Sequence, residues 1–116
     1  GVLGEIAWYS RNSQDKTHPV ARKKPNQFGL YDTLGNVWEW CHDWYAEYPK
    51  NAQTDPTGPK DGTSRIRRGG AWDRDIEHLA TGHRDYDDPS DSFRYFGFRI
   101  ARSASAGATP AAAPLE

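Results

Sequence analysis

The chain has 116 residues, a length that fits one domain. Fifteen Lys and Arg against sixteen Asp and Glu give a formal net charge of -1. This balance excludes a dedicated nucleic-acid or anionic-membrane binder, which would carry a basic excess. No apolar run approaches the roughly 18 residues of a membrane span, and the first residues lack the pattern of a signal peptide. We therefore expect a soluble chain without membrane insertion, in a compartment that the sequence leaves open.

The composition predicts a small core built from aromatic side chains. Only 35% of the residues are hydrophobic, yet 13% are aromatic, and eleven Gly and eight Pro indicate many turns. A disordered chain would be poor in aromatics, whereas each buried aromatic removes about 150–250 Å² from water. Cys41 has no second cysteine to pair with, which excludes an internal disulfide and a CxxC metal site. We expect all the tryptophans to pack in the core: Trp8, Trp38, Trp40, Trp44 and Trp72.

The ordered domain is expected to span residues 1–102. Residues 103–116 form a tail of small residues that cannot bury a core, and its final Leu115-Glu116 is typical of a cloning scar. Within the domain, residues 51–64 are polar and rich in turn formers, which predicts a surface loop.

Three strands and one short helix are predicted within the domain. Trp38 and Trp40 share a face at period two, and the pair Gly69-Gly70 permits a bulge or a close backbone approach. A helix over 77–82 would end at Gly82. The predicted strands cover residues 37–41, 66–72 and 96–101.

Three blocks of this sequence carry a family pattern: PNQFGLYDTLGNVWEWCHDWY (residues 25–45), RRGGAW (67–72) and GFRIAR (97–102). They resemble the core of the formylglycine-generating-enzyme, or sulfatase-modifying-factor, family. The blocks follow one another in the family's order and spacing. The resemblance implies an α+β, C-type-lectin-like fold with a small twisted antiparallel sheet, short helices and extensive loops.

Family members often hold calcium in the block around GNVWEW. Carried over, this implies a structural Ca²⁺ bound by the carbonyls of Gly35 and Val37 and the carboxylate of Glu39, with Leu34 or Asn36 assisting. Hard oxygen ligands in a tight turn suit Ca²⁺. The alternative is that backbone donors or an arginine satisfy Glu39.

The resemblance stops short of catalysis. Formylglycine-generating enzymes bind copper through two cysteines in the later part of the fold, and thiolates are well matched to Cu(I). Residues 42–116 contain no cysteine, and we expect Cys41 to be a small buried thiol rather than a nucleophile. The histidines (His18, His42, His78 and His83) show no ligand spacing and are expected to be solvated or hydrogen-bonded. We therefore predict no enzyme, no catalytic residue and no catalytic cofactor.

Variable proteins of diversity-generating retroelements use the same lectin-like fold and vary the stretch before the GFR block. Their mutagenic step replaces template adenines, which converts Asn codons into codons for Asp, His, Tyr, Ser, Arg and Phe. Asn occurs four times before Ala52 and never after it. This predicts a binding surface within 73–95, built from what we name the candidate surface residues: Asp73, Arg74, Asp75, His78, His83, Asp85, Tyr86, Asp87, Asp88, Asp91, Phe93, Arg94 and Tyr95. The alternative is an ordinary acidic surface loop.

The chemistry of this stretch favours binding of a protein or another macromolecule. Rigid aromatics mixed with charged groups dominate adaptable binding surfaces. Six of the eleven Asp lie between residues 73 and 91, which favours a basic partner unless Arg74, Arg84 and Arg94 neutralise them. The leading hypothesis is a non-catalytic ligand-binding domain. The alternatives are a truncated or degenerate formylglycine-generating-type oxidase domain and a scaffold subunit of a larger assembly.

Overall fold

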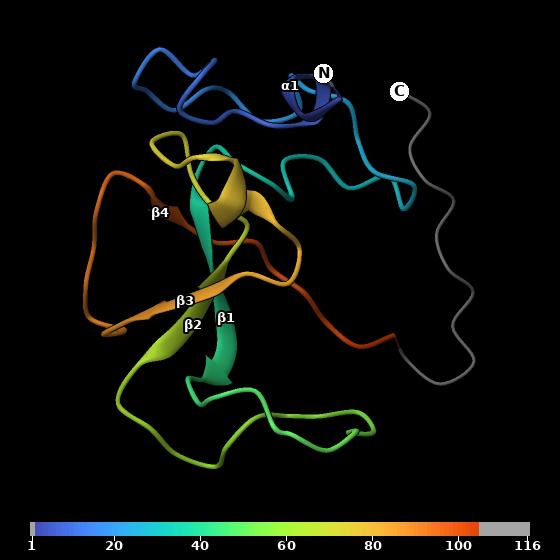
Figure 1. Ribbon diagram of the computed structural model, residues 1–116, viewed down its shortest axis with the longest axis vertical. Helices are drawn as coiled ribbons and strands as arrows, with labels where there is room; N and C mark the ends of the chain where they lie inside the picture. The colour runs from blue at the N-terminus through green and yellow to red at the C-terminus, as the bar shows by residue number, and fades with distance from the viewer. Residues whose placement is uncertain (1, 105–116) are drawn as a thin grey trace.

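The computed structural model describes residues 2–104, in which short regular elements are joined by long loops (Figure 1). Apart from residues 103 and 104, the predicted tail, with Leu115-Glu116, lies outside the described part of the chain. The predicted surface loop over 51–64 is confirmed, because it contains neither strand nor helix. The elements are α1 (Leu3–Ile6), β1 (Trp38–Trp44), β2 (Arg65–Arg68), the 3-10 helix η1 (Ile76–Leu79), β3 (Arg84–Asp87) and β4 (Phe96–Gly97).

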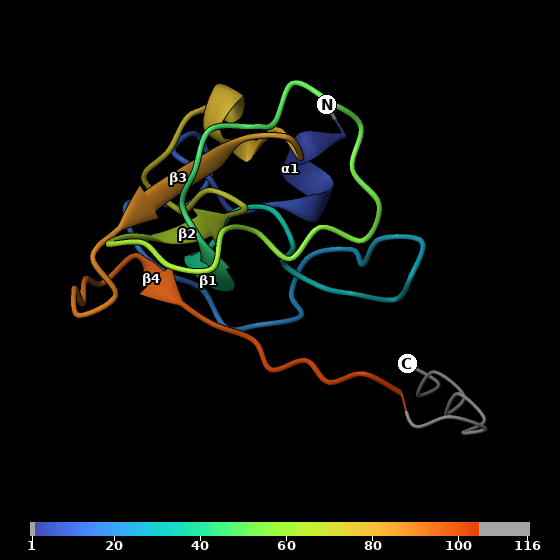
Figure 2. The same cartoon turned by 90° about the horizontal axis from the view of Figure 1, so that it is seen from below.

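The strands form one sheet in the order β3-β2-β1-β4 (Figure 2). β2 pairs antiparallel with both β1 and β3, so that Arg67 lies between Trp40 on one side and Asp85 on the other. β4 pairs parallel with β1, with Phe96 opposite Trp38. The α+β class is confirmed, but the sheet is mixed rather than purely antiparallel. Residues 88–95 carry the chain from β3 at one edge of the sheet to the other edge. They also bring it back to the end of the sheet at which β3 begins, so that β4 runs parallel to β1.

The pair Gly69-Gly70 ends β2 earlier than predicted. Both residues have positive φ, 96° and 72°, a region that side chains other than glycine rarely adopt. A Cβ on Gly70 would lie 2.7 Å from Leu79 Cδ1, and one on Gly69 would lie 2.8 Å from the Thr33 carbonyl oxygen. The predicted close approach is therefore confirmed, and the predicted strand over 66–72 is too long.

Other element boundaries also differ from the predictions. β1 continues to Trp44, and β4 ends at Gly97 rather than at residue 101. The helix expected over 77–82 is the 3-10 turn η1, which ends before Gly82. Neither α1 nor β3 was predicted, because a four-residue helix and an edge strand of charged residues leave no hydrophobic period to read.

The core gathers where β1 passes beneath the loop after β2. Trp38, Ala71, Trp72 and Leu79 are buried there, and the buried Ser13 hydroxyl donates a hydrogen bond of 2.8 Å to the Trp72 carbonyl. All the tryptophans were expected to be buried, and this is correct for Trp38 and Trp72. The others stay half-buried because the sheet is too small to cover them: Trp8 stacks on His18, Trp40 meets the Phe96 edge, and Trp44 lies under Arg65.

Candidate binding surface

A buried arginine organises one face of the sheet. Arg67 is 7% exposed, and its Nη2 donates a hydrogen bond of 2.8 Å to Asp85 Oδ2. Its Nη1 lies 3.7 Å from Asp87 Oδ2. The guanidinium carbon is 4.8 Å from the Trp38 ring centre and 4.7 Å from that of Phe96. One cation thus joins two predicted surface aspartates to the aromatic core.

Aromatic rings continue this face beyond Arg67. Phe93 and Tyr95 stack with ring centres 5.4 Å apart and an angle of 8° between the planes. Both rings meet Phe96 nearly edge-on, at 5.2 and 5.1 Å. Phe93 remains 47% exposed. Their stacking places Phe93 and Tyr95 on one side of the turn in which the Phe96 amide donates a hydrogen bond to the Phe93 carbonyl.

Two arginines complete the aromatic patch. The Arg74 guanidinium carbon lies 5.9 Å from the Tyr95 ring centre, and that of Arg94 lies 5.2 Å from the Trp72 ring centre. Arg74 Nε is also 3.6 Å from Asp73 Oδ1. Arginine over aromatic rings is a combination enriched where proteins bind partners.

The acidic part of the surface is partly neutralised, but mostly by a residue that the sequence did not single out. Among the described residues, Arg74 pairs with Asp73, whereas Arg84 and Arg94 form no ion pair. Arg67 instead neutralises Asp85 and Asp87. No local pattern marks it, because the acid opposite Arg67 is Asp85 on β3, 18 residues further along the chain.

A turn after β3 holds the remaining acids. Asp88 accepts hydrogen bonds from the backbone and hydroxyl of Ser90, and these bonds lower its pKa. A hydrogen bond with Asp87, with desolvation and repulsion from neighbouring aspartates, raises the pKa of Asp91. Asp91 therefore keeps its proton more readily than an isolated aspartate does.

The structure brings together most, but not all, of the candidate surface residues. Asp75 accepts a hydrogen bond from Ser10 at the edge of the group. His78 and His83 lie edge to face with ring centres 5.1 Å apart, and His83 is 6.0 Å from Trp38. Tyr86 stacks on Tyr45 on the opposite face of the sheet. The connected group, here named the β4 surface, consists of Asp73, Arg74, Asp85, Asp87, Asp88, Asp91, Phe93, Arg94 and Tyr95.

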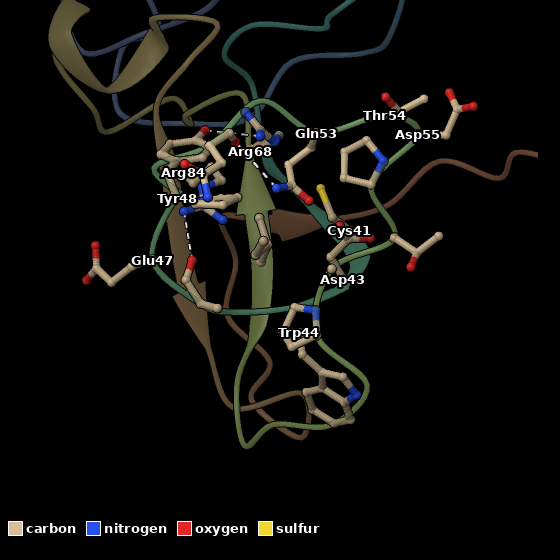
Figure 3. A pocket seen from close by; sticks show the side chains of 18 residues that line it. Cys41, Asp43, Trp44, Glu47, Tyr48, Gln53, Thr54, Asp55, Arg68 and Arg84 are labelled. Carbon is tan, nitrogen blue, oxygen red and sulfur yellow. Dashed lines mark hydrogen bonds between the residues drawn. The ribbon is translucent and has the colours of Figure 1, made fainter.

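A hollow with a volume of about 950 Å³ lies elsewhere on the described part of the chain. Figure 3 shows Cys41, Arg68 and Arg84 facing it from the sheet, below the loop that carries Gln53. Arg68 and Arg84 are held in place there, since they donate hydrogen bonds to the Tyr48 hydroxyl and the Ala46 carbonyl. None of the candidate surface residues lines this hollow. It lies on the face of the sheet opposite to Arg67, and Tyr86, the candidate residue on that face, packs on Tyr45 instead. Hollow volume therefore does not locate the predicted binding surface.

Cys41 lies half-buried in the wall of this hollow. Burial raises the pKa of its thiol, against a weaker opposing effect of Arg68. A raised thiol pKa leaves little thiolate at neutral pH, which disfavours nucleophilic attack and metal binding.

The residues expected to hold calcium are engaged in another way. Arg99 Nη2 donates a hydrogen bond of 2.7 Å to Glu39 Oε2, and Arg99 Nε donates one to Glu39 Oε1. The same guanidinium reaches the Tyr31 and Asp32 carbonyl oxygens. A cation at Glu39 would have to displace a charge-assisted, two-point contact. The set Gly35, Val37 and Glu39 therefore does not fit Ca²⁺ in this arrangement, and the arginine alternative agrees with the contacts.

The described residues contain neither a metal-binding cluster nor a membrane-spanning helix. Within residues 2–104, no group of three or more His, Cys, Asp or Glu side chains is arranged to hold a metal ion. His18 was expected to be hydrogen-bonded, and its Nε2 lies 2.6 Å from the Ser13 carbonyl oxygen. In that same part of the chain, no helix has the length and hydrophobicity needed to cross a bilayer.

The sulfatase-modifying factor enzyme 1-like domain model matches residues 3–104. The chain belongs to this family. A solved structure, Treponema denticola variable protein 1, is 43% identical and superposes with a TM-score of 0.79 over 83% of this chain and 35% of its own. The predicted resemblance and the C-type-lectin-like fold are thus confirmed.

Curated relatives point to more than one kind of protein. The formylglycine-generating enzyme of Streptomyces coelicolor is 39% identical over 76% of this chain and 30% of its own length. The serine/threonine-protein kinase pkn1 of Chlamydia pneumoniae is 41% identical over 75% of this chain and 15% of its own length. The chain thus spans about a third or less of the length of these relatives, and their activities are those of the longer proteins.

Proposed function

We propose that the chain is a non-catalytic ligand-binding domain of the sulfatase-modifying-factor family, whose specificity is carried by the β4 surface. The observation that carries this proposal is the contiguous group in which the half-buried Tyr95 and Arg74 lie beside the exposed Phe93 and Arg94. Aromatic rings contribute large contact area with little loss of conformational entropy. The adjoining carboxylates add charged hydrogen-bond acceptors.

The scaffold supports variation at this surface. Gly97, Phe98 and Arg99 follow it, and Arg99 fixes that segment through Glu39. The buried contacts of Trp38 and Leu79 do not depend on the exposed side chains of Phe93 or Arg94. The side chains of Phe93 and Arg94 can therefore change without opening the core, whereas Asp85 and Asp87 pair with the buried Arg67.

The likeness to Treponema denticola variable protein 1 supports a retroelement origin of these side chains. We propose that the β4 surface is diversified by adenine-directed mutagenesis. The absence of Asn after residue 51 and the prevalence of Asp, Arg, Tyr and Phe agree with that chemistry. A macromolecular partner follows from this proposal, with a basic patch favoured by the acids at 87, 88 and 91.

Sequencing of the genomic locus tests the diversification. A near-copy of the codons for residues 72–99, with adenines at the candidate surface positions and a reverse-transcriptase gene nearby, is expected. Differences at positions other than adenine, or no second copy, would overturn the retroelement proposal while leaving a fixed binding surface open to test.

A display experiment tests the binding role itself. One library randomises Asp87, Asp91, Phe93, Arg94 and Tyr95, and a matched library randomises five exposed positions in loop 51–58. Both are selected against a purified basic protein such as lysozyme. Binders are expected from the first library at a much higher frequency. Equal yields from the two libraries would show that the β4 surface has no special capacity for binding.

The second candidate is a degenerate oxidase domain, favoured by the identity to the Streptomyces coelicolor enzyme. Titration of the purified chain with Cu(I), with Cys41→Ser as the matched control, separates the two. We expect the same weak binding by both proteins, since one thiol with a raised pKa is a poor copper site. Tight stoichiometric binding that the substitution abolishes would favour the oxidase.

A further inference from the structure

Two arginines lie opposite each other on neighbouring strands, at one end of the hollow of about 950 Å³. Arg68 on β2 is the register partner of Arg84 on β3, and Figure 3 shows both side chains beside Tyr48. Like charges at directly opposite positions of neighbouring strands destabilise a sheet. Within residues 2–104, neither arginine forms an ion pair. The repulsion between the two cations is therefore not offset by a carboxylate of this part of the chain.

Tyr48 holds both guanidinium groups in position. The Arg84 guanidinium carbon lies 3.6 Å from the Tyr48 ring centre, and Arg84 Nη2 donates a hydrogen bond of 2.8 Å to the Ala46 carbonyl. Arg68 donates hydrogen bonds to the Tyr48 hydroxyl and the Thr81 carbonyl, at 3.2 and 3.1 Å. These acceptors are all uncharged, so both positive charges remain. Cations held in place in this way lose little conformational freedom when an anion binds.

The carboxylates around the hollow do not neutralise its arginine end. Asp43, Glu47 and Asp55 also line the hollow, but none of them is among the ion pairs of the described residues. Figure 3 shows Glu47 and Asp55 turned away from the arginines. Asp43 lies beside Gly58, where an added Cβ would be 3.0 Å from Asp43 Oδ2. The arginine end is thus left for an anion from outside the chain.

The rest of the wall suits the uncharged part of an organic molecule. Trp44, Pro56 and Ile66 contribute apolar surface, and Gln53 and Thr54 contribute neutral polar groups. Ligand pockets in proteins combine such an apolar lining with a few placed polar groups, and the volume of about 950 Å³ lies within their usual range. An inorganic anion would fill only the arginine end.

We propose that this hollow binds a small organic oxyanion, a phosphate ester or a carboxylate, whose charged group lies between Arg68 and Arg84. Guanidinium groups bind both kinds of oxyanion through paired N–H donors. The body of the ligand lies against Trp44 and Ile66. Alternation along β2 puts this site on the face of the sheet opposite to Arg67, so the proposal does not depend on the proposed function of the β4 surface.

Calorimetry with phenyl phosphate, benzoate and inorganic phosphate tests the site, with chloride used to keep the ionic strength constant. The tighter of the two organic probes identifies the oxyanion, and we expect it to bind about tenfold more weakly to Arg68→Gln, which lacks one charged donor. Arg22→Gln is the matched control, because Arg22 is exposed and its charge is screened, and it should change the affinity by less than about twofold. Equal losses in the two variants would overturn the proposal. So would inorganic phosphate bound as tightly as the organic probes, or no binding of any probe by the parent chain.

The single cysteine of the chain reports where the anion binds. Cys41 lines the same hollow. Burial raises the pKa of its thiol, and Arg68 opposes that rise. An anion on Arg68 cancels this opposing effect, so the tighter organic probe should slow the reaction of Cys41 with iodoacetamide in the parent chain but not in Arg68→Gln. An unchanged rate in the parent chain under saturating probe would place the anion elsewhere and overturn the proposal.

Discussion

Replacing Arg67 by Met tests whether the buried cation holds the sheet together. The substitution keeps an unbranched side chain of similar length, so it fills most of the space and removes the charge. It leaves Asp85 without its hydrogen-bond donor at 2.8 Å and Asp87 without its cation at 3.7 Å. It also removes the guanidinium from the faces of the Trp38 and Phe96 rings.

The magnitude follows from the exposure of the partners. Breaking a fully buried pair costs about 3–5 kcal/mol, but the side chains of Asp85 and Asp87 are about a third exposed and recover water, which reduces this to about 2 kcal/mol. Loss of the two ring contacts adds about 1 kcal/mol. A loss of about 3 kcal/mol lowers the Tm of a domain this size by about 12–20 °C.

Urea unfolding monitored by tryptophan fluorescence measures this loss. Arg94→Met is the matched control, because Arg94 also lies over an indole but is exposed, and it should cost less than about 0.5 kcal/mol. Adding Asp85→Asn to Arg67→Met should restore part of the stability. A loss below 1 kcal/mol for Arg67→Met, or no recovery in the double variant, would refute the reasoning.

Three further outcomes are expected. Gly70→Ala should lower stability by about 2 kcal/mol or more, because alanine is strained at a φ of 72° and its Cβ would lie 2.7 Å from Leu79 Cδ1. Asp91→Asn should raise the Tm at pH 7 more than at pH 3. A carboxyl whose pKa is raised in the folded state favours folding when protonated and loses that contribution as the pH rises. The Cys41 thiol should react with a disulfide reagent at pH 7.5 more slowly than free cysteine, because burial raises its pKa.

Each of these outcomes has a result that contradicts it. A Gly70→Ala protein as stable as the parent would mean that the chain does not need a left-handed residue there, and Gly82→Ala, with nothing within 4 Å of an added Cβ, is the control. Equal Tm changes for Asp91→Asn at both pH values would show that Asp91 is an ordinary carboxyl. Rapid modification of Cys41 would show that the hollow wall is open to solvent.

The features of the fold that depend on residues close together in the sequence were predictable. The long block ending at Tyr45 identified the family, and Gly69-Gly70 indicated a close backbone approach because only glycine tolerates it. The boundaries of the elements were less predictable. β3 and the parallel position of β4 depend on pairing between segments distant in the chain, which no local hydrophobic period records.

The sequence predicted the segment that carries the candidate surface, but not which of its side chains lie together in space. The residue types between 73 and 95 indicated a binding surface, yet alternation along β3 sends Tyr86 to the opposite face from Asp85 and Asp87. Arg67 was missed, because its role is visible only when β2 lies between β1 and β3. Glu39, one of the expected calcium ligands, pairs with Arg99, which lies 60 residues away in the sequence. The block around Glu39 could not reveal this contact.

The sequence by itself determined the family, the mixed α+β class and the kinds of side chain available for binding, because these depend on residue identity and short spacings. The tertiary structure decided which of those side chains meet. Long-range pairing set the order of the strands, and that order placed Arg67 between two aspartates and two aromatic rings. It also anchored Arg99 on Glu39, a residue 60 positions earlier in the chain.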